Sequence, residues 1–186
     1  MSKPLVSILI PAFNAERFVA DTLRSALAQT WPNKEIILMD DGSTDNTLAV
    51  ARQFAEAGVT VATQKNQGAA AARNALLALS RGEFIQWLDA DDLLHPEKIE
   101  RQMHAALSTS SRRTIFSAGW AYFIYRPRKA RFSPTALWGD MPPLEWMTRK
   151  MEQNLHMQTA TWLTRRDVLL AAGPWNTKLL GDDDGE

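Results

Sequence analysis

An alternation of predicted strands and helices fills the first 108 residues and constrains the fold more than any other feature. Apolar, β-branched runs occur at residues 5–10, 35–39, 59–63 and 83–88, and each is followed by a helical apolar pattern, at residues 15–29, 45–57, 69–80 and 96–108. Each helix has to cross back over the sheet before the next strand begins, so the strands are expected to be parallel. The pattern predicts an α/β fold with a Rossmann-like, doubly wound, mostly parallel sheet and helices on both faces.

The second part of the chain is less regular. A run of aromatic and β-branched residues predicts one long strand at 115–125, followed by a loop to residue 143, a helix at 144–151, a strand at 159–163 and a helix at 167–172. A chain of 186 residues has the size of one domain. We therefore expect a single domain over 1–186, with a ligand-binding half at 1–112 and a second half at 113–186.

Charge and composition exclude several classes of protein. The 21 basic and 21 acidic residues cancel, so no overall field marks a nucleic-acid-binding protein. The chain has no cysteine, which excludes disulfides and thiolate metal sites and leaves oxygen ligands for any metal. No apolar stretch reaches the ~18 residues of a transmembrane segment, so we expect a soluble, cytoplasmic protein. The sequence does not indicate an oligomeric state.

Residues that directly follow the predicted strands are the first candidates for a ligand site, because open α/β sheets bind ligands at the carboxyl ends of their strands. Phe13 can stack on a planar base, Asp41 can accept hydrogen bonds from a base or a ribose, and Arg73 can contact a phosphate. Each also has an ordinary interpretation: Phe13 in the core, Asp41 in a turn, and Arg73 exposed to solvent. An aromatic ring, a carboxylate and a cation together suit the base, ribose and phosphates of one nucleotide. Their occurrence at separate strand ends therefore favours a nucleotide site.

Three carboxylates lie within four residues after the fourth predicted strand: Asp89, Asp91 and Asp92. Such a cluster is costly unless a cation neutralises it, and Mg²⁺ or Mn²⁺ commonly binds one or two carboxylates together with the oxygens of a substrate diphosphate. The alternative is a solvated turn before the helix that begins at Pro96. The apolar run at 85–88 fixes the turn at the edge of the sheet and favours the metal site.

Four motifs, in their order and spacing, resemble those of the family 2 glycosyltransferases of the GT-A fold. They are Pro-Ala-Phe-Asn at 11–14, Met-Asp-Asp-Gly-Ser-Thr-Asp at 39–45, Asn-x-Gly at 66–68 followed by Ala-Arg-Asn at 72–74, and Trp-Leu-Asp-Ala-Asp-Asp at 87–92. The resemblance implies a GT-A fold, a nucleotide site, and a divalent metal, Mn²⁺ or Mg²⁺, held by Asp91 and Asp89. The nucleotide-binding residues that it implies are Pro11, Ala12, Phe13, Asn14, Asp41, Asn66, Gly68, Arg73, Asp89 and Ala90.

The resemblance also implies a general base in the second half of the domain. The matching segment is Leu-Gly-Asp-Asp-Asp-Gly-Glu at 180–186, in which Asp184 is the expected base, with Asp183 behind it. Like-charge repulsion from neighbouring acids is expected to raise the pKa of Asp184. Family members normally continue well past this motif, so the chain is expected to be truncated just after it, with 113–186 as an incomplete acceptor-side half.

By this resemblance the chain is an inverting, metal-dependent glycosyltransferase that moves a sugar from a nucleotide diphosphate, commonly uridine diphosphate, to a hydroxyl of a saccharide or lipid-linked acceptor. The implied setting is bacterial cell-surface polysaccharide synthesis, in the cytoplasm or at the inner face of the membrane. The alternative is a truncated or non-catalytic domain that binds nucleotide sugars. A nicotinamide dehydrogenase is excluded, because the first turn at 11–14 lacks a Gly-x-Gly-x-x-Gly phosphate loop.

Overall fold

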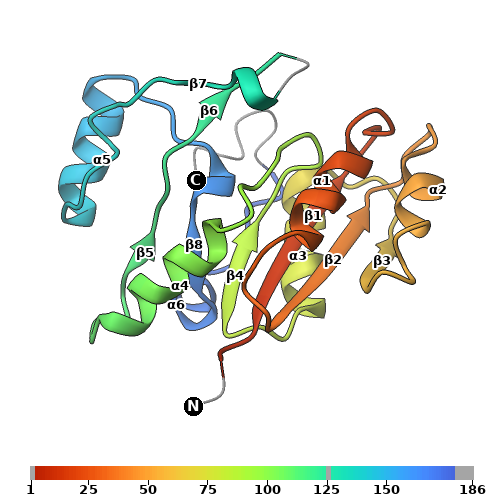
Figure 1. Cartoon of the computed structure of the whole chain (residues 1–186), viewed down its shortest axis with the longest axis horizontal. Helices are drawn as coiled ribbons and strands as arrows, with labels where there is room; N and C mark the ends of the chain where they lie inside the picture. The colour runs from red at the N-terminus through yellow and green to blue at the C-terminus, as the bar shows by residue number, and fades with distance from the viewer. Residues whose placement is uncertain (1–2, 125–126, 179–186) are drawn as a thin grey trace.

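The computed structural model describes residues 3–124 and 127–178 and contains a six-stranded sheet with helices on both faces (Figure 1). The strands of this sheet are β1 (Val6–Ala12), β2 (Lys34–Asp40), β3 (Val59–Thr63), β4 (Phe84–Trp87), β5 (Ile115–Phe116) and β8 (Leu163–Arg165). They lie in the order β3-β2-β1-β4-β8-β5; the first four are parallel, and β8 is antiparallel to both of its neighbours. The predicted doubly wound, mostly parallel fold is confirmed.

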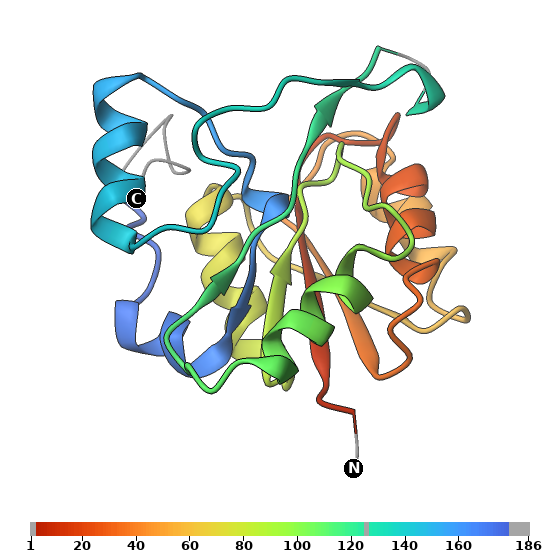
Figure 2. The ribbon, with the colours of Figure 1, turned by 60° about the vertical axis from the view of Figure 1, so that its left-hand side comes forward.

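Two hydrophobic cores lie on opposite faces of the sheet. Ile8 and Ile10 of β1 point to one face and Leu9 to the other, as the two-residue period of a strand requires. The first face is covered by α1 (Val19–Leu27), α2 (Thr47–Arg52) and α4 (Lys98–Ser108), and the second by α3 (Ala69–Leu79) and α6 (Arg166–Ala172) (Figures 1 and 2). Since both faces are buried, the central strands are apolar on both sides, which explains their continuous apolar runs.

The order of the strands reverses at β1. The next two strands along the chain, β2 and β3, lie on one side of β1, and β4 lies on the other. A crevice forms at such a reversal, outside the carboxyl ends of the strands. The segments that follow β1, β2 and β4 therefore meet at one edge of the sheet.

The single strand predicted at 115–125 is wrong. The segment contains β5 and a second two-residue strand, β6 (Ala121–Tyr122), which pairs with β7 (Arg131–Phe132) in a separate hairpin. Strand β5 ends at Phe116, and between the two strands Gly119 packs so closely on Trp138 that a Cβ atom there would lie only 2.7 Å from its Cζ3. This contact comes from a residue far along the chain, so a local apolar pattern could not predict it.

The strand predicted at 159–163 is also misplaced. Residues Thr159–Thr161 form a 3-10 turn, η2, and strand β8 begins only at Leu163. The turn starts because the side chain of Gln158 accepts a hydrogen bond from the amide of Ala160, at 2.9 Å. The carbonyl of Ala160 in turn accepts from Nε2 of Gln86 on β4, at 2.8 Å, which ties the second half of the chain to the sheet.

The helix predicted at 144–151 is confirmed as α5 (Pro143–Glu152), although none of its residues is buried. Helix α2 begins two residues later than predicted, because Asp45 accepts hydrogen bonds from the amide and the hydroxyl of Thr47, at 2.9 and 2.5 Å. Burial acts to raise the pKa of Asp45, but the hydrogen bonds from Thr47 outweigh it and lower the pKa. No helix in residues 3–124 and 127–178 is long and apolar enough to cross a membrane.

Candidate functional site

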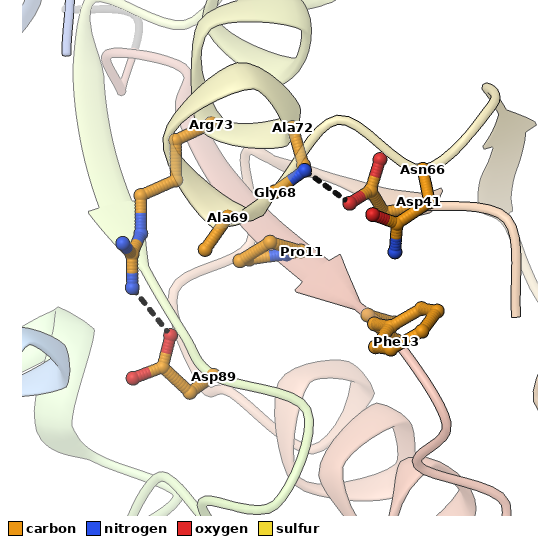
Figure 3. A pocket seen from close by; sticks show the side chains of 10 residues that line it. Pro11, Phe13, Asp41, Asn66, Gly68, Ala69, Ala72, Arg73 and Asp89 are labelled. Atoms are coloured by element: carbon orange, nitrogen blue, oxygen red, sulfur yellow. Dashed lines mark hydrogen bonds and ion pairs between the residues drawn. The ribbon is translucent and has the colours of Figure 1, made fainter. Parts of the chain in front are cut away.

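A cleft of about 390 Å³ lies at the carboxyl edge of the sheet, at the reversal of strand order (Figure 3). Eight of the predicted nucleotide-binding residues line it, and they come from the ends of β1, β2 and β4 and from the segment that leads into α3. The lining residues are Pro11, Ala12, Phe13, Asp41, Asn66, Gly68, Ala69, Ala72, Arg73 and Asp89. The structure thus brings together side chains that lie up to 78 residues apart in the sequence.

Asp41 organises the loop that precedes α3. Its buried carboxylate accepts hydrogen bonds from the amides of Gln67 and Gly68, at 3.0 and 2.8 Å, and from Nε2 of Gln64, at 2.8 Å. A negative charge is favourable at this position, because the amino end of a helix carries a partial positive charge. Asp41 therefore shapes one wall of the cleft, and its predicted direct contact with a nucleotide stays a prediction.

Gly42 allows the loop to approach β2 this closely. Its φ angle is +69°, and a Cβ atom there would lie 2.7 Å from the amide nitrogen of Asn66. Both facts favour glycine. Any other residue would strain the backbone at this positive φ, and its Cβ atom would push Asn66 away. The Asp-Gly pair in the second motif thus sets the position of Asn66 at the cleft.

Arg73 is a buried cation at the cleft. Only 4% of the residue is exposed, so its interpretation as an ordinary exposed arginine is wrong. Its guanidinium group pairs with the carboxylate of Asp89 at 3.1 Å (Figure 3). The same group lies 4.8 Å from the centre of the Trp175 ring. A buried charge needs such partners, and the pair places a cation and a carboxylate on the same side of the cleft.

Phe13 presents a free aromatic surface to the cleft. The residue is 49% exposed, so its interpretation as a core residue is wrong. Figure 3 places its ring across the opening from Asp89, beside Asp41 and Asn66. A planar base could stack on this ring.

Two predicted nucleotide-binding residues do not line the cleft. Asn14 ties the end of β1 to the next turn: its amide donates to Oγ of Ser43 at 3.0 Å, and its Oδ1 accepts from the amide of Thr44 at 2.8 Å. The carbonyl of Ala90 accepts from Oγ1 of Thr22 on α1, at 2.8 Å. Both residues hold turns at the edge of the cleft, and their predicted nucleotide contacts stay predictions.

The three carboxylates after β4 have different surroundings. Asp89 pairs with Arg73, and Asp92 accepts a hydrogen bond from Nε2 of Gln158. Asp91 is exposed and forms no hydrogen bond or ion pair with residues 3–124 or 127–178. Asp91 thus offers an open carboxylate beside Asp89, as a metal ligand requires.

The sequence predictions missed some residues of the site and named others that the structure does not describe. Ala69 and Ala72 line the cleft; the signal that could have identified them is two small side chains three residues apart in the first turn of a helix. Gln158 was missed because its contact with Asp92 spans 66 residues. The predicted base Asp184, with Asp183, lies outside the described residues.

Comparisons with known proteins identify the family of the chain. The model of the family described as "Glycosyl transferase family 2" matches residues 7–170. The putative teichuronic acid biosynthesis glycosyltransferase TuaG of Bacillus subtilis is 37% identical over 111 residues, which cover 58% of this chain and 44% of TuaG. The chain spans less than half the length of the curated relatives that it matches.

Solved structures share the fold. TarS 1–349 of S. aureus, in complex with UDP, has a TM-score of 0.76 and 21% identity, over 96% of this chain and 52% of TarS 1–349. The mannosyltransferase PcManGT of Pyrobaculum calidifontis, in complex with GDP-Man and Mn²⁺, has a TM-score of 0.68 and 21% identity, over 98% of this chain and 50% of PcManGT. Since the family model matches most of the chain, from residue 7 to residue 170, this protein belongs to glycosyl transferase family 2.

Proposed function

We propose that the chain provides the donor site of an inverting, metal-dependent glycosyltransferase that transfers a sugar from a nucleotide diphosphate, UDP in the first instance, to a hydroxyl of a saccharide or lipid-linked acceptor. The names of relatives such as TuaG support a role in bacterial cell-surface polysaccharide synthesis. The observation that carries the proposal is the single cleft, in which residues from three strand ends and one helix start meet.

The cleft has a suitable group for each part of a nucleotide diphosphate. The exposed ring of Phe13 is suited to stacking on the base, and Asn66 and Asp41 offer polar atoms beside it. The amino end of α3 and the cation of Arg73 are suited to the diphosphate, because both carry positive charge. UDP bound to TarS and GDP-Man bound to PcManGT support this class of ligand.

Asp91 and Asp89 are the proposed ligands of the divalent metal, Mn²⁺ or Mg²⁺. They fit it chemically, because Asp91 is an open carboxylate and such ions bind oxygen ligands shared between protein and diphosphate. Among the described residues no group of three His, Asp or Glu side chains converges, so the remaining ligands would come from the diphosphate and water. When bound, the ion would offset the charge that grows on the departing diphosphate.

Asp184 is the proposed general base, which takes the proton from the acceptor hydroxyl as that oxygen attacks the anomeric carbon. Within the described residues, the backbone of Trp175, nine residues before Asp184 in the sequence, forms two hydrogen bonds with the side chain of Asn74 on α3, at 2.8 and 2.9 Å. Direct displacement with the diphosphate leaving from the opposite face would invert the anomeric centre.

The donor site is tested by calorimetric titration of UDP into the chain with and without Mn²⁺, with GDP and dTDP as alternatives. Asp91→Asn is expected to remove the effect of Mn²⁺, whereas Asp140→Asn, a matched change of an exposed aspartate, should leave it intact. Absence of binding by all three nucleotides would contradict the proposed donor site. Equal Mn²⁺ dependence in the Asp91→Asn variant would contradict the proposed metal ligand.

The catalytic part is tested by comparing sugar transfer with UDP affinity in Asp184→Asn. Loss of a general base is expected to lower the rate of transfer by about 10²- to 10⁴-fold while UDP affinity stays the same. Nucleotide binding without transfer to any acceptor hydroxyl in the unchanged chain would instead support the alternative function, a domain that binds nucleotide sugars without catalysis.

A further inference from the structure

One segment of this neutral chain is strongly basic. Residues 101–139 contain seven arginine and lysine residues and no acidic residue, although the whole chain has 21 of each charge. Three of the seven, Arg128, Lys129 and Arg131, are exposed in η1 (Pro127–Lys129) and β7. Three positive charges and no described negative charge therefore lie on the β6–β7 hairpin, which we define as the described residues of 121–132.

The same hairpin exposes large apolar side chains. Tyr122 is 63% exposed, Ile124 80% and Phe132 66%. Strands β6 and β7 pair with each other in a two-stranded sheet of their own, and η1 has no buried residue. A two-stranded hairpin is marginally stable in water, so apolar side chains exposed on one indicate a surface that another partner covers.

The hairpin lies on the side of the molecule that carries the carboxyl ends of the parallel strands. Both views place it above β1 and β4, at the end of the sheet opposite the N-terminus (Figures 1 and 2). The donor cleft opens at this same edge. A partner that covers the hairpin would thus be on the side from which an acceptor reaches the cleft.

We infer that the β6–β7 hairpin docks on the surface of an anionic lipid bilayer. Tyr122, which pairs with Arg131 on the same face of the hairpin, and Ile124 enter the boundary between headgroups and acyl chains. Arg128, Lys129 and Arg131 meet the lipid phosphates. A soluble acidic partner would neutralise the cations but would not by itself require two exposed aliphatic and aromatic side chains beside them. Membrane docking of the hairpin does not depend on the proposed function. Only its consequence rests on that function, namely that the cleft would face lipid-linked acceptors.

The test is flotation of the 186-residue chain with phosphatidylcholine vesicles that either contain or lack phosphatidylglycerol. We expect binding only to the anionic vesicles and loss of binding at high salt. Arg128→Gln with Lys129→Gln should lower the partition coefficient by roughly 25-fold, about fivefold for each charge near the surface. Tyr122→Ser with Ile124→Ser should also lower it, including at low salt.

Matched variants control for net charge and for loss of exposed apolar surface. Arg52→Gln with Arg113→Gln removes the same charge elsewhere, and Leu79→Ser with Leu170→Ser changes two exposed apolar residues outside the hairpin. Retained binding in both control pairs supports the inference. It is overturned by equal binding to neutral vesicles, by no binding, or by equal losses in the controls. UDP titration of the same variants keeps a failure of this inference separate from a failure of the donor site.

Discussion

Glu35 and Asp41, at opposite ends of β2, use the same chemistry at the two edges of the sheet. Each carboxylate holds a loop that arrives from later in the chain. Glu35 accepts from Oγ of Ser7 at 2.6 Å and from the amides of Arg81 and Gly82 at 2.6 and 3.2 Å. Asp41 accepts from the amides of Gln67 and Gly68 and from the side chain of Gln64.

The two carboxylates differ in what else surrounds them. Glu35 forms an ion pair with Arg81 at 3.1 Å and does not line the donor cleft. Asp41 lines the cleft and forms no ion pair with a cation in the described parts of the chain. Hydrogen bonding by a carboxylate is therefore not in itself a sign of function. The position at the reversal of strand order distinguishes the edge of the proposed donor site from the opposite edge.

The largest expected difference comes from removing the charge at each end of β2. Asp41→Asn places a neutral amide group opposite two backbone N–H groups and weakens the hydrogen bonds that shape the cleft. Hydrogen bonds to a charged group are worth about 1.5–3 kcal/mol, so UDP affinity should fall by roughly 10- to 100-fold. Glu35→Gln should lower the free energy of unfolding, by about 1 kcal/mol or less after solvent screening, and leave UDP affinity unchanged. Urea unfolding and calorimetry measure both quantities, and equal losses of UDP affinity would contradict the comparison.

A second pair of variants tests the close approach of the two loops. A Cβ atom at Gly82 would lie 2.4 Å from Oγ of Ser7, and one at Gly42 would lie 2.7 Å from the amide nitrogen of Asn66. Gly82→Ala and Gly42→Ala should each lower the free energy of unfolding by about 1–3 kcal/mol. Only Gly42→Ala should also weaken UDP binding. Thermal melts with and without UDP measure both effects. The prediction is contradicted if UDP raises the Tm of Gly42→Ala as much as it raises the Tm of the unchanged chain.

The smallest expected effect is a dependence on pH at the amino edge. Burial acts to raise the pKa of Glu35, but hydrogen bonds from Ser7 and Arg81 outweigh it and lower the pKa below 4.5. The ionised carboxylate therefore stabilises the folded state fully above about pH 4.5, the ordinary pKa of a glutamate. This contribution is lost as the pH falls through the lowered pKa of the folded state. Allowing for solvent screening, we expect about 1 kcal/mol or less. Urea unfolding between neutral and acidic pH should show a shallower decline in Glu35→Gln.

The sequence predicted the regular half of the fold and most of the cleft, because both depend on local patterns. The four strand-and-helix units have strong periodicity, and residues such as Phe13 and Asp41 directly follow strands. The errors occur where distant side chains decide the local structure. Trp138 packs against Gly119 in the irregular segment between β5 and β6, and a side-chain cap by Gln158 replaces the first part of a predicted strand with a turn. Neither contact has a signature within its own segment.

The packing of Trp175 has an optical consequence. Its ring lies against the guanidinium group of Arg73, and Arg73 pairs with Asp89 at the cleft. Indole emission responds to the electric field of nearby charges, so a diphosphate or a divalent ion arriving beside this pair should change the fluorescence of Trp175. The chain has seven tryptophans, and the difference between its emission and that of Trp175→Phe would isolate the signal. The protein thus carries its own unlabelled reporter of donor-site occupancy.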